Sequence, residues 1–150
     1  MNQQVLIPEL RIRRLCEDAV LPQYMTPGAA AFDLYIPRKR DYMLSPHETV
    51  MIGLGFATSF PPEFVAHMYA RSGLGAKGIG LANHVAVIDS DYRGEWVVAM
   101  HNNTEHLTRL TGGYRIAQCV IHHRPLVNIV EVVELDTTAR AEGGFGSTGS

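Results

Sequence analysis

The chain has 150 residues, of which 46% are hydrophobic and 19% are charged, and its formal net charge is −2. This composition is typical of one globular domain that can bury a core without disulfides or structural metals. It excludes a general electrostatic attraction to nucleic acids or membranes, so a few placed cations and backbone amides must hold any anionic ligand.

Short runs rich in β-branched and aromatic residues alternate with turn-forming residues along the whole chain. Such runs predict strands, and we expect them over residues 5–12, 49–56, 64–69, 95–100, 115–121 and 128–135. In the last run the polar alternation is imperfect, which indicates a strand buried on both sides or packed against a neighbour. The best helix candidate is one short turn that Ser72 caps, that runs to Lys77 and that Gly78 ends.

Many short strands without a long amphipathic helix predict an all-β, single-domain fold, a jelly-roll-like β-barrel with one short helix. We expect the barrel domain over residues 1–136. From residue 137 to 150 the apolar pattern gives way to glycine, serine and threonine. This composition is typical of a mobile C-terminal arm.

The start of the chain and its cysteines bear on its location. Residues 1–9 lack the basic start and the apolar run of a signal peptide, and no apolar stretch is long enough to span a bilayer. Cys16 and Cys119 are too few for a disulfide framework. We therefore expect a cytoplasmic protein that binds no membrane and no nucleic acid.

Two internal segments carry residues suited to chemistry. Residues 70–78 read Ala-Arg-Ser-Gly-Leu-Gly-Ala-Lys-Gly, so Arg71 would lie beside the free amides of a capped helical turn. This is either an anion site or an ordinary turn with a solvated arginine. Residues 83–94 contain Asp89 and Asp91, two positions apart, which suit a metal ligand pair, a general base or a simple turn.

The C-terminal arm is the third such segment. Residues 140–150 read Arg-Ala-Glu-Gly-Gly-Phe-Gly-Ser-Thr-Gly-Ser. Its glycines let the backbone wrap closely around an oxyanion, Arg140 offers a planar fork for a phosphate, and Phe145 can stack on a base. No lysine follows the glycines, so this is not a P-loop. Composition alone favours a disordered tail.

With two further segments, these three form an ordered set of five motifs that resembles the trimeric deoxyuridine triphosphatases. The additional motifs are Ala-Ala-Phe-Asp-Leu at residues 30–34 and Gly-Tyr-Arg-Ile-Ala-Gln at residues 113–118. The set spans nearly the whole chain. Its most specific members are Arg-Ser-Gly-Leu-Gly, Ile-Asp-Ser-Asp-Tyr and Gly-Gly-Phe-Gly-Ser-Thr-Gly.

The resemblance implies an enzyme that hydrolyses dUTP to dUMP and pyrophosphate by attack of water on the α-phosphate. Such an enzyme keeps uracil out of DNA and supplies dUMP for thymidylate synthesis. It also implies a homotrimer whose active sites are shared between chains. Mg²⁺ would be held by the triphosphate and waters, without a direct protein ligand, consistent with how reluctantly this ion dehydrates.

The same resemblance assigns roles to single residues. Asp89 is similar to the general base that orients and deprotonates the attacking water. Tyr92 resembles the ring beneath the deoxyribose, where a 2′-hydroxyl would collide, and Asn83 resembles the residue that reads the uracil edge. Asp33 resembles a residue that supports the metal-phosphate cluster indirectly and braces Arg71.

The remaining implied contacts are to the phosphates and to the base. Phosphate contacts are expected from Arg71, Ser72, Gly73 and Gln118. The arm is expected to add contacts by closing on the nucleotide, with the aromatic ring over uracil and the polar groups toward the β- and γ-phosphates; its residues are Arg140, Phe145, Gly146, Ser147 and Thr148.

The sequence departs from the family pattern at several positions. Ala31, Ala86 and Ala141 replace family glycines, and each costs about 1 kcal/mol or more if its φ must be positive. Tyr114 replaces an acidic residue of the fourth motif. Two alternatives follow. One is a dUTP-binding regulatory module without turnover. The other is a dCTP deaminase, although Ala99 stands where a deaminase needs a glutamate.

Overall fold

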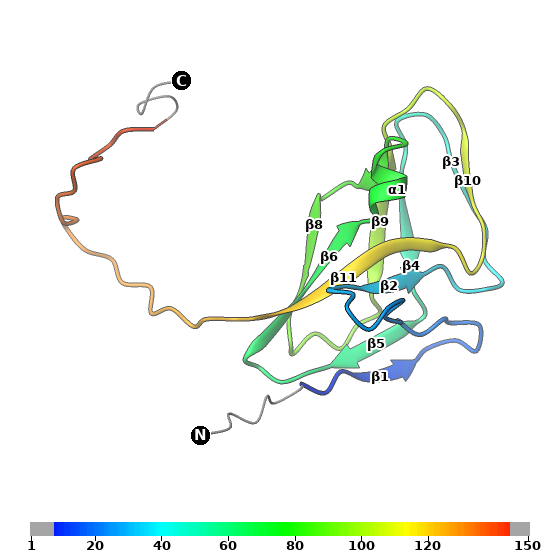
Figure 1. Ribbon diagram of the computed structural model, residues 1–150, viewed down its shortest axis with the longest axis horizontal. Helices are drawn as coiled ribbons and strands as arrows, with labels where there is room; N and C mark the ends of the chain where they lie inside the picture. The colour runs from blue at the N-terminus through cyan, green and yellow to red at the C-terminus, as the bar shows by residue number, and fades with distance from the viewer. Residues whose placement is uncertain (1–7, 145–150) are drawn as a thin grey trace.

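The computed structural model describes residues 8–144, and this part of the chain is almost entirely β. It contains one short helix among the strands (Figure 1). The elements are β1 (Arg11–Arg14), β2 (Phe32–Tyr35), β3 (Tyr42–Leu44), β4 (Thr49–Gly53), β5 (Phe56–Ser59), β6 (Phe64–Ala70), α1 (Ser72–Gly75), β7 (Ile79–Leu81), β8 (Val85–Ile88), β9 (Val97–Asn102), β10 (Thr108–Leu110) and β11 (Arg115–His123).

The strands pair antiparallel in four sheets. The largest has the order β2-β11-β6-β8, a second has the order β4-β9-β7, and β1-β5 and β3-β10 form two-stranded ribbons. The predicted all-β class and jelly-roll-like arrangement are therefore confirmed. Within residues 8–144 the sheets remain separate and do not close into one barrel.

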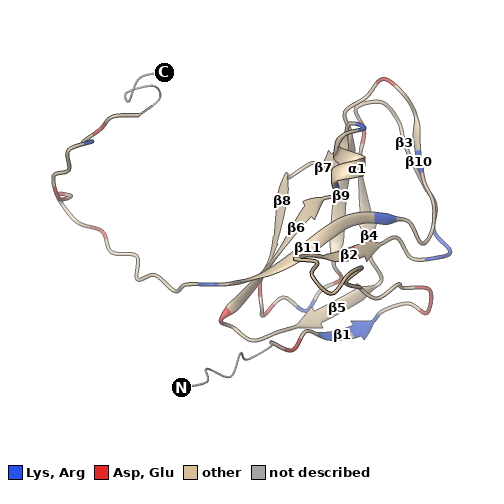
Figure 2. Ribbon diagram, in the orientation of Figure 1, with Lys and Arg blue, Asp and Glu red and all other residues tan. Residues whose placement is uncertain are grey.

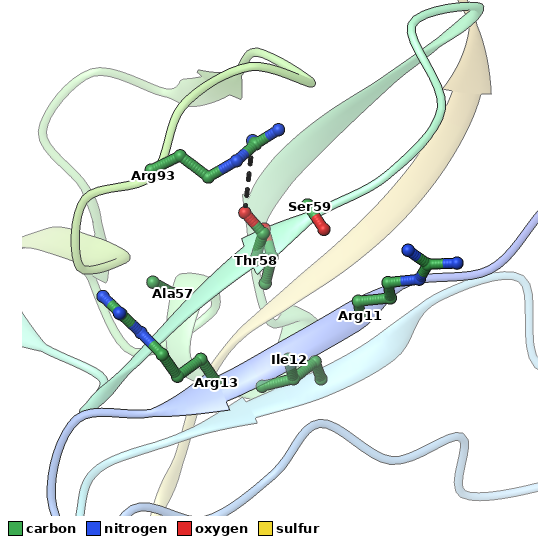
Figure 3. A pocket seen from close by; sticks show the side chains of 7 residues that line it. All are labelled: Arg11, Ile12, Arg13, Ala57, Thr58, Ser59 and Arg93. Carbon is green, nitrogen blue, oxygen red and sulfur yellow. Dashed lines mark hydrogen bonds between the residues drawn. The ribbon is translucent and has the colours of Figure 1, made fainter.

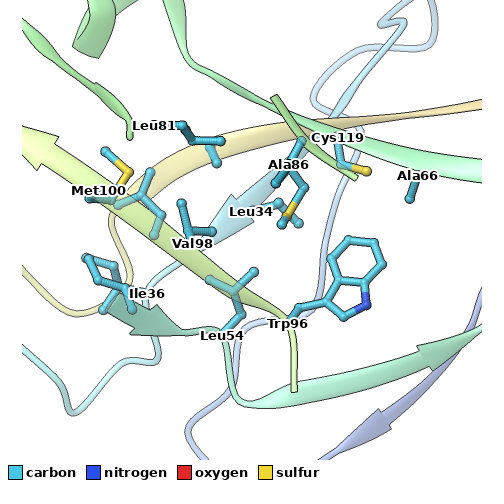
Figure 4. Close-up of a cluster of buried hydrophobic side chains, with 14 of the residues drawn as sticks. Leu34, Ile36, Leu54, Ala66, Leu81, Ala86, Trp96, Val98, Met100 and Cys119 are labelled. Atoms are coloured by element: carbon cyan, nitrogen blue, oxygen red, sulfur yellow. The ribbon is translucent and has the colours of Figure 1, made fainter. Parts of the chain in front are cut away.

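Alternation along the strands of the four-stranded sheet separates a core face from an outer face. Phe32, Cys119, Met68 and Ala86 are register partners across its four strands, and all four are buried. They belong to one core cluster with side chains from outside this sheet, among them the fully buried Trp96, which directly precedes β9 (Figure 4). Since successive residues of a strand point to opposite faces, the next row across these strands lies on the outer face.

Three of the predicted strands correspond to β6, β9 and β11 within two residues at each end. The single strand predicted over residues 49–56 is wrong, because the chain forms β4 and β5 there. Gly55 breaks the ladder with a φ of +76°, and a Cβ at this position would come within 2.4 Å of the Cys16 sulfur. The first strand in the described residues, β1, overlaps only the last two positions of the predicted range 5–12 and continues to Arg14.

The helix lies near its predicted position but begins differently. Ser72 is the first residue of α1, Arg71 is the residue before it, and no side chain caps the helix. The predicted Ser72 cap is therefore wrong. The turn does end at Gly78, whose φ of +77° is easily adopted only by glycine. No helix in the part of the chain described by the structure is long and apolar enough to cross a membrane.

After β11 the chain leaves the body. Arg124 makes the last contacts with it, since its amide and its Nε donate to the carbonyls of Glu63 and Pro62 at 2.7 and 3.0 Å. The strand predicted over residues 128–135 is wrong for the isolated chain, where this segment has no strand to pair with and extends away from the sheets (Figure 1). The seven large apolar side chains of residues 126–135 are at least 55% exposed: Leu126, Val127, Ile129, Val130, Val132, Val133 and Leu135.

Candidate functional site

A buried carboxylate holds two arginines at one end of the four-stranded sheet. Asp33 is only 8% exposed, and its two carboxylate oxygens accept hydrogen bonds from Arg71 Nε at 3.2 Å and from Arg115 Nη1 at 3.0 Å. Arg71 also donates to the carbonyl of Arg115 at 3.2 Å. The expected bracing of Arg71 by Asp33 is present in this geometry, whereas Arg115 is a partner that the sequence reasoning missed.

The same end of the sheet brings Gln118 next to these charges. Asp33, Gln118, Tyr69 and Val85 are register partners in one row across the four strands, on the outer face. The Gln118 side chain donates to the carbonyl of Ala70 at 3.0 Å, so its amide is held at the end of β6. The phosphate-binding residues expected from the second and fourth motifs thus converge in space.

Arg71 also leads into α1. Its carbonyl accepts the first helical hydrogen bonds, from the amides of Leu74 and Gly75 at 3.0 and 2.9 Å. The amides of Ser72 and Gly73 precede these bonds, and both residues are exposed. Two backbone amides that precede the helical hydrogen bonds and a partly exposed guanidinium therefore lie close together in the chain, an arrangement that suits an oxyanion.

Asp89 and Tyr92 form a second group. They line one hollow of about 170 Å³ together with Glu95 and with residues at the ends of β8 and β9, which are Val87, Ile88 and Val97. The chain turns between them, because the Tyr92 amide donates to the Asp89 carbonyl at 3.2 Å. This turn brings both side chains to the same space, which a continuous strand would not do for residues three apart. Glu95 was missed by the sequence reasoning, although it directly follows the third motif.

The two groups lie far apart within one chain. Ile88, the residue before Asp89, pairs with Ala66 on β6, whereas Arg71 follows the other end of that strand. Five residues along a strand span roughly 16 Å. The Arg71 side chain points toward Asp33 on β2, away from β8. One chain therefore does not bring Asp89 and Arg71 to the same phosphate group.

Two further predicted contacts also lie outside these groups. Asn83 lies in the turn between β7 and β8, at the opposite end of β8 from Asp89, and it is exposed. It is not among the residues that line the hollow. Arg140 lies on the extended tail, where its Nε donates to the Gly143 carbonyl at 2.9 Å. The other expected arm residues lie outside the described residues: Phe145, Gly146, Ser147 and Thr148.

The alanines that replace family glycines differ in backbone conformation. Among these three, only Ala141 adopts a positive φ, +44°. Ala86 lies buried in the regular strand β8, so its methyl group adds to the core without backbone strain. Tyr114, the other departure, is 41% exposed, and its carbonyl accepts the Ile36 amide at 3.0 Å.

A different hollow, of about 380 Å³, lies on the β1-β5 ribbon (Figure 3). Arg11, Arg13 and Arg93 surround it above the small side chains of Ala57 and Ser59. The arginines of β1 also appear as the basic patch on that strand in Figure 2. This hollow contains none of the predicted site residues, so its size alone does not identify it as the reaction centre.

Cysteine and metal chemistry find little support in the described residues. Burial raises the pKa of the Cys119 thiol to about 12, so this thiol is not a nucleophile at neutral pH. Over residues 8–144, no group of three or more His, Cys, Asp or Glu side chains could hold a metal ion.

The chain is similar to known proteins over most of its length. A model of the dUTPase family matches residues 17–149. The deoxyuridine 5′-triphosphate nucleotidohydrolase of Thermoanaerobacter sp. (strain X514) is 43% identical over 134 residues, which are 89% of this chain and 90% of that protein. Its counterpart in Desulfitobacterium hafniense (strain DSM 10664 / DCB-2) is 45% identical over 131 residues, 86% of this chain and 87% of that protein.

Solved structures share the fold. The dUTPase of Staphylococcus bacteriophage 80alpha with dUPNHPP superposes with a TM-score of 0.85 at 25% identity, over 95% of this chain and 99% of that one. A dUTPase from phage phi11 of S. aureus, described with a structural Mg(II) ion, gives a TM-score of 0.78 at 21% identity, over 86% of this chain and 99% of that one.

Proposed function

The chain belongs to the dUTPase family and hydrolyses dUTP, and we propose that a water molecule held by Asp89 attacks the α-phosphate. The observation that carries this proposal is the turn that brings Asp89 and Tyr92 to one hollow between β8 and β9. The relatives at 43% and 45% identity are nucleotidohydrolases, so neither the deaminase nor the binding module without turnover is favoured.

In this mechanism Asp89 accepts a proton from water as the water oxygen bonds to the α-phosphorus. The bond from that phosphorus to the bridging oxygen breaks, and pyrophosphate leaves from dUMP. An exposed aspartate is a weak base, so Asp89 acts mainly by holding the water in line. Assistance of this kind contributes on the order of 10²- to 10⁴-fold. The Tyr92 ring lies under the deoxyribose and leaves no space for a 2′-hydroxyl.

The phosphates are held at the other group. We assign these contacts to Arg71, the backbone of Ser72 and Gly73, and Gln118. Asp33 fixes the Arg71 guanidinium before substrate arrives, so binding loses less side-chain entropy than it would with a free arginine. Charge that develops on the triphosphate then meets donors that are already oriented.

Mg²⁺ fits this site as an ion carried by the substrate. Both Asp33 oxygens already accept hydrogen bonds from arginine, so Asp33 supports the phosphate cluster indirectly. When bound to the triphosphate oxygens and waters, the ion reduces the negative charge that the attacking water meets. The residues of this chain that orient the phosphates are Arg71 and Gln118.

We propose a homotrimer in which each active site is shared between chains. Asp89 and Arg71 lie too far apart to serve one nucleotide from a single chain, and the exposed apolar segment 126–135 needs a partner surface. A closed three-fold ring builds three equivalent sites in this way. A third chain would supply the arm, with Arg140, Phe145, Gly146, Ser147 and Thr148 closing on the nucleotide.

The cellular role follows from the reaction. Removal of dUTP keeps uracil out of DNA, and the product dUMP is a precursor for thymidylate synthesis. We place the protein in the cytoplasm, in keeping with its two free thiols and the absence of disulfides in residues 8–144.

A pyrophosphate-release assay tests the reaction. Purified protein with Mg²⁺ is given dUTP, dCTP, dTTP or UTP in parallel. We expect turnover of dUTP and much slower turnover of the other three. Ammonia release from dCTP would instead indicate a deaminase, and tight dUTP binding without pyrophosphate release would indicate a binding module.

A further inference from the structure

The position of the Tyr92 ring depends on the two residues at the end of its loop. Its hydroxyl donates to the backbone carbonyl of Glu95 at 3.1 Å. The ring also lies directly against Gly94, because a Cβ there would come within 2.3 Å of the tyrosine oxygen and 2.5 Å of Cζ. The ring is therefore held by main-chain atoms of residues 94 and 95, and it moves if that stretch moves.

The Glu95 side chain attaches this loop to the body of the molecule. Its Oε1 accepts a hydrogen bond from the Gly55 amide at 2.8 Å, in the turn between β4 and β5. The carboxylate lies over Gly53, where a Cβ would fall 2.5 Å from Oε1 and 2.8 Å from Cδ. Absence of a side chain at position 53 thus leaves the space that the carboxylate fills.

The residues around this anchor are buried and joined by backbone hydrogen bonds. Gly55 is buried, and its φ of +76° fixes the direction of its amide. The next residue after Glu95 is the fully buried Trp96, whose amide donates to the Phe56 carbonyl at 3.0 Å and whose carbonyl accepts from Leu54 at 2.9 Å. One end of the tyrosine loop is therefore held by the core, and Glu95 connects the rest of the loop to the same strands.

We propose that Glu95 is a positioning residue that determines sugar specificity. By binding the Gly55 amide it fixes its own carbonyl, and this carbonyl fixes the Tyr92 ring where a 2′-hydroxyl would collide. The inference rests on the proposed function, in which Tyr92 faces the sugar. An amide acceptor needs no charge, so a glutamine at position 95 keeps the anchor whereas an alanine removes it.

The test uses the full chain with Mg²⁺ and compares kcat/KM for dUTP and UTP. Glu95→Ala should lower the dUTP to UTP ratio by about 10-fold or more, since steric exclusion of one hydroxyl is weakened. Glu95→Gln should retain the ratio to within about 3-fold, because its side-chain oxygen still accepts from Gly55.

Gly53→Ala tests the same anchor without changing Glu95. Its new methyl group displaces only the flexible end of the Glu95 side chain, so the protein should fold and the ratio should fall as in Glu95→Ala. Met51→Ala is the matched control, because Met51 lies two residues earlier on the same face of β4 and is 64% exposed. It should leave the ratio unchanged.

Two results would overturn the proposal. One is a wild-type ratio in folded Gly53→Ala or Glu95→Ala, and the other is an equal loss in Glu95→Gln and Glu95→Ala. A general fall in activity with the ratio preserved likewise indicates a purely structural role. Failure of the proposed function is distinct, since the wild-type protein would then release no pyrophosphate from dUTP.

Discussion

Arg71 and Asp89 lie at opposite ends of the pair formed by β6 and β8. Arg71 follows the last residue of β6, whereas Asp89 follows Ile88, whose register partner is Ala66 near the start of that strand. The Arg71 side chain turns further away, toward Asp33. The proposed water-holding carboxylate and the proposed phosphate-binding arginine of one chain thus lie at different places on the molecule.

Mixing two inactive variants tests this separation. Arg71→Ala and Asp89→Asn should each lose about 10²-fold or more of turnover. In trimers reassembled at random from equal amounts, about a quarter of the sites combine both intact residues from different chains. Activity should return to roughly that fraction of wild type. If mixed trimers confirmed by mass remain inactive, both residues serve a site within one chain.

Asp89→Asn alone should separate chemistry from binding. The amide keeps the shape of the carboxylate but no longer accepts a proton, so kcat should fall by about 10²-fold or more. Calorimetric titration with a non-hydrolysable dUTP analogue should give nearly the wild-type Kd. Asp41→Asn is the control, since this carboxylate binds Arg109 on the exposed surface. Near-normal turnover in Asp89→Asn would remove Asp89 from the mechanism.

Asp33→Ala should weaken both substrate binding and stability. Two arginines lose their common partner, and since both are partly exposed they can turn to water, so the free energy of unfolding should fall by about 1–2 kcal/mol. KM for dUTP should rise because Arg71 is no longer oriented. Urea unfolding and steady-state kinetics measure these effects. A stability loss with unchanged KM would limit Asp33 to a structural role.

The Cys119 thiol predicts a loss of stability in alkali. In the folded protein the pKa of the thiol is about 12, so the thiol keeps its proton until the pH approaches that value. In the unfolded chain the thiol loses its proton near its usual pKa of 9.0. Between these values the unfolded state binds fewer protons, so stability falls as the pH rises. Relative to Cys119→Ala, wild type should lose up to about 1 kcal/mol more per pH unit in this window. Urea titrations at fixed protein concentration measure the difference, and parallel slopes would contradict the prediction.

Two truncations should separate assembly from catalysis. Deletion of residues 143–150 should leave a trimer with little activity, because the arm is lost while the apolar segment remains. Deletion of residues 126–150 should abolish the trimer, because seven large exposed apolar side chains are removed. Analytical ultracentrifugation distinguishes the two states. A stable trimer after the longer deletion would show that other surfaces hold the chains together.

The sequence alone predicts much of this fold and part of the site. Hydrophobic runs identify β6, β9 and β11. Local patterns do not identify Gly55 as a strand break, because the positive φ of Gly55 and its close approach to the Cys16 side chain belong to the folded chain and leave no local signal. Sequence reasoning also interprets the valine-rich run near the C-terminus as a strand, because an apolar pattern predicts burial but does not identify the surface that would bury it.

The bracing of Arg71 shows a second limit. Motif resemblance links Asp33 to this arginine, but Arg115 joins them through the pairing of β2 with β11, whose register shifts next to Arg115. Long-range pairing of this kind depends on the whole sheet, not on the local pattern. The separation of Arg71 from Asp89 likewise requires the register of β6 and β8.

In the proposed trimer, folding also depends on encounter between chains, because the exposed apolar segment 126–135 needs a partner surface. A newly synthesised subunit carries an unpaired, valine-rich stretch of high β-propensity, the kind of sequence that aggregates when it finds the wrong partner. Correct docking is a concentration-dependent step that competes with such aggregation. Glu131 and Glu134 lie within this stretch and Asp136 directly follows it, so like charges oppose the stacking of identical copies in register. These three carboxylates, which are not among the proposed site residues, therefore oppose aggregation of newly synthesised chains.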